Sequence, residues 1–233
     1  MAGRDGHADA HADTRGVSHS LDRLVEVMDR LRSPGGCPWD ARQTHASLVP
    51  YLLEESHELA EAVDAGDRSG MREELGDVLL QVVFHARVAS EHPDDPFDLD
   101  DVADVLVDKL VGRHPHVFAD APVEGDLHAQ WDRLKRAEKP DRASALDGVP
   151  VGLPALARAA ALAQRARRAG IDPAADDPVA DDPVDVGAAD DETAVGRALL
   201  ELVLAHPGVD AEGALRRATR DWQTHVRRRE SAG

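Results

Sequence analysis

The chain has 233 residues and a formal net charge of −18, which disfavours nucleic-acid polymers and anionic membranes as partners because both bind basic surfaces. No apolar run approaches the ~20 residues of a membrane-spanning helix, and the N-terminal stretch around Arg4 and Arg15 lacks the apolar core of a signal peptide. The single cysteine, Cys37, excludes an internal disulfide and suits the reducing cytoplasm, where we expect the protein.

Helical periodicity covers most of the first half of the chain, and no stretch shows the sustained two-residue alternation of a strand. Residues 1–18 have no periodicity and are expected to form a flexible tail. A helix follows over residues 21–31 with Ser20 as its N-cap, and the Pro- and Gly-rich segment 33–38 ends it. Further helices are expected over residues 46–65, 69–90, 99–112 and 131–139. The pattern therefore predicts an all-α fold.

The second half of the chain has weaker helical patterns. Residues 141–170 are expected to contain a connecting helix. Residues 171–191 consist mainly of Asp, Pro and Ala, which cannot form an apolar helix face, so we expect a linker there. Two more helices are expected over residues 193–206 and 211–229.

Five acidic residues on two helices joined by one turn are the most informative feature of the sequence: Glu54, Glu55, Glu58, Glu74 and Asp77. With the turn centred near Asp67, Glu58 and Asp77 should lie at the same height, flanked by Glu55 and Glu74 about one helical turn away. Carboxylates ~4 Å apart repel each other by ~4 kcal/mol at an effective dielectric constant of 20, so the cluster requires a cation. Oxygen ligands of this kind suit Mg²⁺ or Mn²⁺.

The alternative is a solvated acidic helix face. It fits residues 46–65 taken alone, because Leu52, Leu59 and Val63 lie on the side opposite to the acids. The helix that carries Glu74 and Asp77 is apolar on almost all sides and should be buried. A buried carboxylate must be paired or bind a metal ion, which favours the metal site.

Four sequence blocks follow one another in order. They are Gly36-Cys37-Pro38-Trp39-Asp40 with Gln43-Thr44; Glu54-Glu55-x-x-Glu58 with Glu74-x-x-Asp77, the latter continuing as Gly76-Asp77-Val78-Leu79-Leu80-Gln81-Val82-Val83-Phe84; Lys109-Leu110-x-x-Arg113-His114-Pro115-His116-Val117-Phe118; and Trp131-x-x-Leu134-Lys135 with Glu138-Lys139. Together, over residues 21–139, they resemble the MazG nucleoside triphosphate pyrophosphohydrolases of the all-α NTP pyrophosphatase superfamily.

The resemblance implies that residues 19–140 form a helical bundle that dimerises with a second copy and cleaves nucleoside triphosphates to monophosphate and pyrophosphate, in house-cleaning or control of the nucleotide pool. It implies one or two Mg²⁺ ions, with Mn²⁺ as a possible substitute. Glu54 would be a further ligand or would orient the attacking water. The metal ligands would be Glu55, Glu58, Glu74 and Asp77; the phosphate contacts would be Lys109, Arg113, Lys135 and Lys139; and Trp39 or Trp131 would stack on the base.

Some of these assignments have ordinary structural alternatives. Arg113 taken alone fits equally well as a surface cation near a helix C-terminus, and a lone tryptophan is more often a core residue. For the protein as a whole, two alternatives remain. One is a non-catalytic helical oligomeric interaction module with a structural metal site. The other is a superfamily relative that acts on dUTP or phosphoribosyl-ATP.

Residues 192–233 resemble the remnant of a second unit of the same kind, following the linker over residues 171–191. Aligning Gly196 with Gly76 places Ala194 where the first unit has Glu74, and Arg197 where it has Asp77. A metal site cannot be built from these residues. Any activity is therefore expected from the first unit, with the remnant helices serving in packing.

Overall fold

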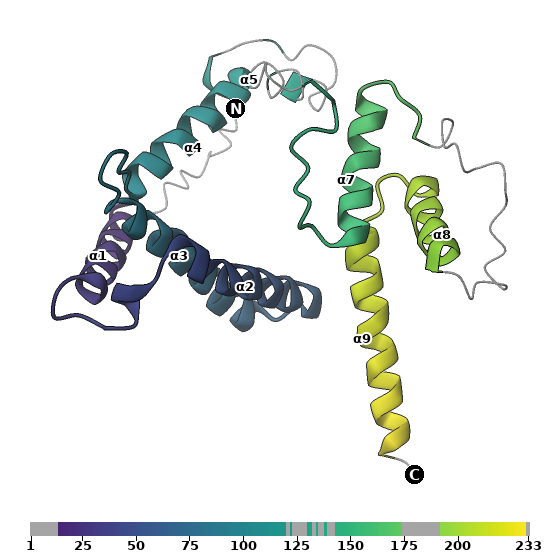
Figure 1. Ribbon diagram of the computed structural model, residues 1–233, viewed down its shortest axis with the longest axis horizontal. Coiled ribbons are helices and arrows are strands. Elements are labelled where there is room, and N and C mark those ends of the chain that lie inside the picture. The colour runs from purple at the N-terminus through teal and green to yellow at the C-terminus, as the bar shows by residue number, and fades with distance from the viewer. Residues whose placement is uncertain are drawn as a thin grey trace, which may run out of the picture. The chain divides into compact units, whose positions relative to one another are not determined.

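The computed structural model describes residues 14–119, 122, 130, 131, 134, 138, 143–173 and 192–231, and every regular element among them is a helix (Figure 1). The predicted all-α class is confirmed. The chain divides into two compact units, Met1–Trp131 and Asp132–Gly233. The first unit contains α1 (Thr14–Arg32), the short 3-10 helix η1 (Asp40–Arg42), α2 (His45–Ala65), α3 (Arg68–Ala89), α4 (Leu99–Arg113) and α5 (Pro115–Phe118).

The start of α1 differs from the expectation. The helix begins at Thr14, so residues 14–18 are helical and Ser20 lies inside the helix instead of capping it. Extending an existing helix adds one hydrogen bond per residue without a new nucleation step, which outweighs the local preference of serine for a cap. The rest of the expected tail, residues 1–13, lies outside the described residues.

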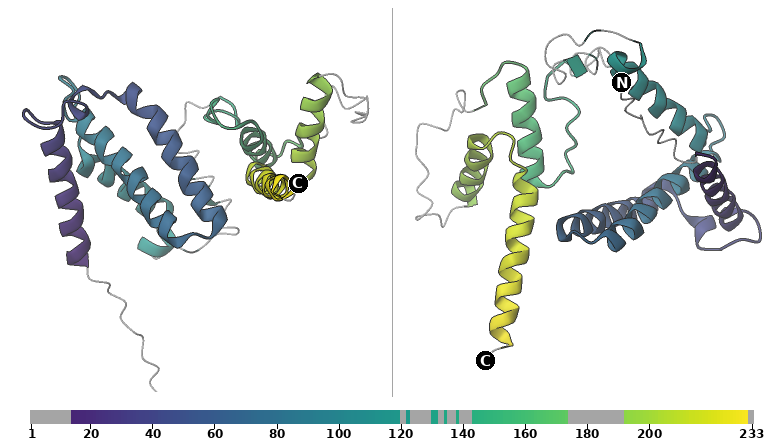
Figure 2. Two further views of the ribbon diagram at one scale, coloured as in Figure 1. Left: turned by 90° about the horizontal axis from the view of Figure 1, so that it is seen from below. Right: turned by 180° about the vertical axis from the view of Figure 1, so that it is seen from behind.

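Helices α2 and α3 form an antiparallel hairpin and lie side by side (Figure 2). Thr44 caps α2, because its hydroxyl accepts a hydrogen bond from the backbone of Ser47 at 3.2 Å. Gly66 ends this helix in the left-handed conformation, with φ of 67°, where a residue with a side chain would be strained. Asp67 then caps α3 by accepting hydrogen bonds from the next backbone amides. Only two residues therefore connect the helices.

The apolar core lies at the end of the hairpin away from this turn. Its fully buried members are Met28 on α1, Leu48 on α2, and Val83 and Phe84 on α3. Leu99, at the start of α4, packs against them. The single chain covers α3 only in part, and its burial in a larger assembly stays a prediction. Leu75, in the N-terminal half of α3, is 54% exposed.

Arg32 joins three segments around this core. Its guanidinium donates two hydrogen bonds of 2.8 Å to Glu91, which follows α3, and others to the backbone carbonyls of Asp40 and Gln43. The Arg32 side chain is 7% exposed. Its hydrogen bonds lower the pKa of Glu91, and Arg87 adds to the effect. The end of α1, the segment before α2 and the end of α3 are thereby held together.

The second unit contains α7 (Ala155–Arg168), α8 (Glu192–Ala205) and α9 (Ala211–Glu230). Helix α7 contacts both of the others, with Ala163 and Val203 among the buried residues. Two expected helices are confirmed as α8 and α9. The connecting helix is shorter than residues 141–170, because residues 143–154 form turns and Pro154 precedes α7. Most of the expected linker lies outside the described residues, and so does most of the helix expected over 131–139.

No helix among the described residues is both long enough and apolar enough to span a membrane.

We predict that Arg32→Met lowers the free energy of unfolding by about 2–4 kcal/mol, because two backbone carbonyls and part of the Glu91 carboxylate lose their donor. Urea denaturation followed by circular dichroism measures the change. Arg23→Met, on the exposed surface of the same helix, is the matched control and should stay within about 0.5 kcal/mol of the wild type. Equal stability of the two variants would contradict the role of Arg32.

Candidate metal centre

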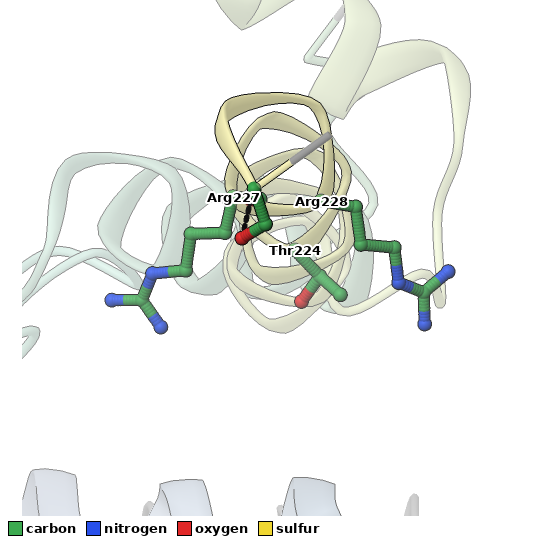
Figure 3. Close-up of a pocket in the computed structure, with 4 residues that line it drawn as sticks. Thr224, Arg227 and Arg228 are labelled. Carbon is green, nitrogen blue, oxygen red and sulfur yellow. Dashed lines mark hydrogen bonds between the residues drawn. The ribbon is translucent and has the colours of Figure 1, made fainter. Parts of the chain in front are cut away.

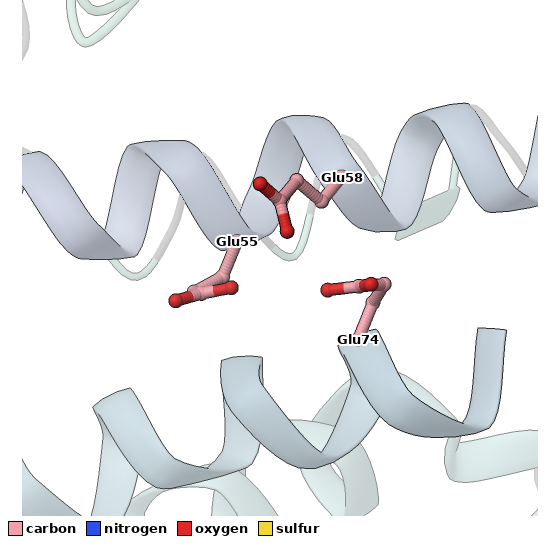
Figure 4. A group of neighbouring side chains, drawn as sticks. All are labelled: Glu55, Glu58 and Glu74. Carbon is pink, nitrogen blue, oxygen red and sulfur yellow. The ribbon is translucent and has the colours of Figure 1, made fainter. Parts of the chain in front are cut away.

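Three glutamates from the α2–α3 hairpin form the candidate site. Glu55 and Glu58 extend from α2 toward Glu74 on α3 (Figure 4). Each offers one carboxylate oxygen, and these three oxygens lie within 4.8 Å of one another. Glu55 and Glu74 are half-buried, whereas Glu58 is exposed. In the part of the chain that the structure describes, this is the one group of three acidic, histidine or cysteine side chains close enough to share a metal ion.

The charges of the cluster act across the hairpin. Among the neighbouring charges, Asp77 acts most strongly on Glu55, and Glu58 acts most strongly on Glu74. The three oxygens that lie within 4.8 Å of one another belong to Glu55, Glu58 and Glu74. That Glu58 and Asp77 lie at the same height stays a prediction.

The electrostatics of the cluster are unfavourable without a cation. Partial burial raises the pKa of Glu55, and the charges of Asp77, Glu58 and Glu54 raise it further. Burial likewise raises the pKa of Glu74, followed by the charges of Glu58, Asp77 and two other glutamates. All the charged side chains that shift the pKa values of Glu55 and Glu74 are acidic. Neither glutamate takes part in an ion pair with another described residue. Oxygen donors gathered from two helices without a basic partner fit a hard divalent cation.

The structure separates the other two acids from the group of three. Asp77 is half-buried, and its charge raises the pKa of both Glu55 and Glu74. Glu54 is exposed and has the smallest effect among the acids that raise the pKa of Glu55.

The candidate substrate contacts are distributed over several segments. Trp39 is 44% exposed and meets the rings of Tyr51 and Phe84 edge-on, with centroids 5.9 and 6.4 Å apart. Arg113 on α4 places its guanidinium 6.0 Å from the centre of the Trp131 ring. Lys109 is exposed on α4, and neither it nor Arg113 is among the charges that act on Glu55 or Glu74. Lys135 and Lys139 lie outside the described residues.

Two residues on the helix faces that carry the acids were given no role in the sequence interpretation. Tyr51 stands four residues before Glu55, and Gln81 stands four residues after Asp77. Residues spaced by four share a helix face, so this spacing was a usable signal. It was obscured because both residues lie within otherwise apolar stretches.

A hollow at the end of α9 is a different kind of feature. It is lined by Thr224, Arg227, Arg228 and Ser231, whose side chains all come from one helix end (Figure 3). Ser231 donates a hydrogen bond to the backbone carbonyl of Arg227. The hollow is lined by residues of this helix end alone, and no acidic residue is among them.

The fold and the site define a class of all-helical proteins that gather carboxylates from two antiparallel helices to bind a metal ion. Residues 43–118 match the sequence model of the MazG nucleotide pyrophosphohydrolase domain. The chain is 52% identical over 208 residues to a 26.1 kDa protein of Streptomyces cacaoi, covering 88% of this chain and 80% of that protein. The chain belongs to the MazG family.

Two relatives carry functional names. The chain is 47% identical over 153 residues to the nucleoside triphosphate pyrophosphohydrolase/pyrophosphatase MazG of Thermotoga maritima, covering 65% of this chain and 58% of that protein. It is 45% identical over 159 residues to the nucleoside triphosphate pyrophosphohydrolase of Escherichia coli, covering 66% of this chain and 60% of that protein. The chain thus spans less than two thirds of the length of these two relatives.

We predict that Glu74→Gln raises the melting temperature of the metal-free protein at pH 7. The raised pKa of Glu74 means that the folded state favours its protonated form. The stability that this residue contributes is therefore present below its unfolded pKa and is lost as the pH rises through its folded pKa. A neutral Gln carries no charge at pH 7, so the variant does not lose this stability. The gain should therefore vanish near pH 4, and calorimetry at both pH values in the presence of EDTA tests it.

The matched control for this experiment is Glu61→Gln. Glu61 is exposed on α2 and is not among the charges that raise the pKa of Glu55 or Glu74. It should leave the melting temperature unchanged at both pH values. A destabilised Glu74→Gln at pH 7 would contradict the electrostatic description of the cluster.

Proposed function

We propose that this protein hydrolyses nucleoside triphosphates to nucleoside monophosphates and pyrophosphate, with Mg²⁺ as the metal ion and Mn²⁺ as a substitute. The observation that carries the proposal is the group formed by Glu55, Glu58 and Glu74, whose carboxylates lie within 4.8 Å without a basic partner among the described residues. The names of the relatives from Thermotoga maritima and Escherichia coli support the substrate class and the reaction.

In this proposal Glu55, Glu58 and Glu74 hold the metal, and Asp77 completes the ligand set. The metal would supply Lewis acidity and charge neutralisation to the triphosphate. Glu54, the exposed outer carboxylate, accepts a hydrogen bond from the attacking water and orients it toward the α-phosphorus. A bond forms from the water oxygen to that phosphorus as Glu54 takes the proton of the water, the bond from the phosphorus to the bridging oxygen breaks, and pyrophosphate leaves with the electron pair of that bond.

The remaining substrate contacts rest on the family resemblance. Lys109, Arg113, Lys135 and Lys139 would neutralise phosphate charge, which the net charge of −18 otherwise opposes. Trp39, whose ring is 44% exposed, is the better base-stacking candidate, because the Trp131 ring already contacts Arg113. No observation favours a purely structural metal site, or dUTP or phosphoribosyl-ATP as the substrate.

A homodimer is part of the proposal. Large apolar side chains remain exposed on both helices of the hairpin, with Leu53 at 56%, Val63 at 53% and Leu75 at 54%. Contiguous exposed apolar surface is typical of protein interfaces. A second copy would cover the N-terminal half of α3, which α2 alone leaves open.

The second unit has a packing role in this proposal. Its described residues contain no group of three side chains that could hold a metal ion, and Ala194 and Arg197 lie on α8 at the positions aligned with Glu74 and Asp77. The activity is therefore assigned to the first unit. A cytoplasmic location stays a prediction from the single cysteine.

We predict that Glu58→Gln lowers Mg²⁺-dependent pyrophosphate release more than ~100-fold, because losing even an outer-shell partner of a metal typically costs ~10–100-fold. The substrates are the four common ribonucleoside triphosphates, and the products are resolved as pyrophosphate or orthophosphate. Circular dichroism confirms that the variant is folded, and Glu61→Gln should retain wild-type turnover. Substantial Mg²⁺-dependent activity of folded Glu58→Gln would refute the metal assignment.

We predict that the protein sediments as a homodimer at micromolar concentration and that Leu75→Glu shifts it toward monomer. Leu75 is a 54% exposed apolar residue in the N-terminal half of α3, and a charge there would be buried at the interface. Val27→Glu, on the 53% exposed surface of α1, is the matched control and should leave the dimer intact. An active wild-type monomer would contradict this prediction.

A further inference from the structure

Two histidines form a hydrogen-bonded pair across the α2–α3 hairpin. His45 is the first residue of α2, and His85 lies in the C-terminal half of α3. Their Nδ1 atoms are 2.8 Å apart, and their rings are stacked with an angle of 12° between the planes. Two ring nitrogens at this distance share a hydrogen bond, so one of them carries the proton and the other accepts it. The pair therefore joins the two helices at the end of the hairpin away from the turn at Gly66.

The surroundings of the two rings determine which nitrogen carries the proton. Nε2 of His85 is buried without a hydrogen-bond partner, whereas His45 is exposed, so its Nε2 can bond with water. Buried N–H donors without an acceptor are rarer in proteins than buried acceptors without a donor. We therefore assign the proton of His85 to its Nδ1 atom, which donates to Nδ1 of His45. The proton of His45 then lies on its Nε2 atom.

A further proton on this pair is incompatible with the hydrogen bond. On His45 the free position is Nδ1, and a proton there would face the Nδ1–H donor of His85. The bond could persist only if His85 moved its own proton to Nε2, which has no acceptor. A charged His45 would also lie at the N-terminus of α2, where the helix dipole disfavours positive charge. Protonation therefore separates the two rings.

The charged groups of the neighbouring helix ends do not offset this effect. They are Asp29 and Arg32 on α1, Asp40 and Arg42 on η1, Arg87 and Glu91 at the end of α3, and Asp98 and Asp101 at the start of α4. None of these charges shifts the pKa of His85. Burial lowers that pKa from its usual value of 6.5, and the charge of His45 lowers it further. The stability that neutral His85 contributes is therefore fully present above its unfolded pKa and is lost as the pH falls from the unfolded pKa toward the folded pKa.

We propose that His45 and His85 form a pH-dependent contact, which holds the start of α2 against α3 at neutral pH and opens when the medium is acidified. The first turn of α2 contains the core residue Leu48, and the segment before it contains Trp39, whose ring contacts Phe84. Opening of the contact loosens this end of the hairpin. The contact lies about 15 Å along α2 from Glu55, so the inference goes beyond the proposed hydrolysis and does not depend on it.

A transition-metal ion shared by the two Nδ1 atoms is the alternative. Each ring would then carry its proton on Nε2, and histidines that bind metals almost always donate this proton to a carboxylate, a carbonyl or water. Nε2 of His85 has no such partner. Among the described residues, no third histidine, cysteine or acid completes a metal-binding group with the pair. Both observations favour a shared proton.

The variant His45→Asn tests the proposal, because the asparagine oxygen can accept the hydrogen bond from His85 but does not titrate. The melting temperature is measured in EDTA at pH 7 and pH 5. Between these values the wild type should lose about 2–4 °C more than His45→Asn, which is the shift that one hydrogen bond produces in a chain of this size. His19→Asn changes an exposed histidine of α1 and is the matched control, which should behave like the wild type.

Nuclear magnetic resonance of the histidine ring nitrogens tests the protonation states directly in the wild-type protein. At pH 7, His85 should be neutral with its proton on Nδ1, and His45 should be neutral with its proton on Nε2. The signals of both rings should change together as the pH is lowered, because the proton that charges the pair also separates it. Comparison with the spectrum of His45→Asn assigns the two rings.

The inference is wrong if His45→Asn loses as much stability as the wild type between pH 7 and pH 5, or if the proton of His85 lies on Nε2 at pH 7. It is also wrong if Zn²⁺, added without EDTA at pH 7, raises the melting temperature of the wild type far more than that of His45→Asn, because the pair would then bind a metal ion. If His45→Asn does not fold, the resonance titration of the wild type decides. None of these results bears on the hydrolysis of triphosphates.

Discussion

The antiparallel register of α2 and α3 is the constraint on which the rest of the first unit depends. The helices are joined by Gly66 and Asp67 alone, and this turn brings glutamates of both helices within 4.8 Å of one another. The glutamates repel, so they cannot hold the helices together. The turn holds one end of the hairpin, and the core around Leu48, Val83 and Phe84 holds the other. The unfavourable charges lie between these two stable ends, where a cation relieves them.

The acids of the candidate site and the apolar residues of the core therefore lie at different heights along the hairpin. Nearest the turn are the acids, which a cation can neutralise. Tyr51 and Gln81 lie about one helical turn further from the turn. Beyond them lies Phe84, a core residue whose ring is contacted by the guanidinium of Arg32. This order means that the acids can be replaced without removing the contacts that fold the unit.

The two units differ in what their described residues hold. The first contains both the group of three glutamates and an apolar core, whereas the described residues of the second contain helices packed around Ala163 and Val203 without a group of three side chains that could hold a metal ion. That residues 192–233 are the remnant of a second unit of the same kind stays a prediction.

The sequence by itself determined the all-α class and the helices of the hairpin to within a residue or two, together with the three glutamates of the site, because helical period and acid spacing are local properties. The approach of Glu74 to Glu55 and Glu58, the early start of α1 at Thr14 and the burial of the Gln81 carbonyl required the tertiary structure. Register depends on where a turn begins, and a shift of one residue there changes which side chains face each other across the hairpin. Burial depends on neighbours distant in the chain, which no local pattern records.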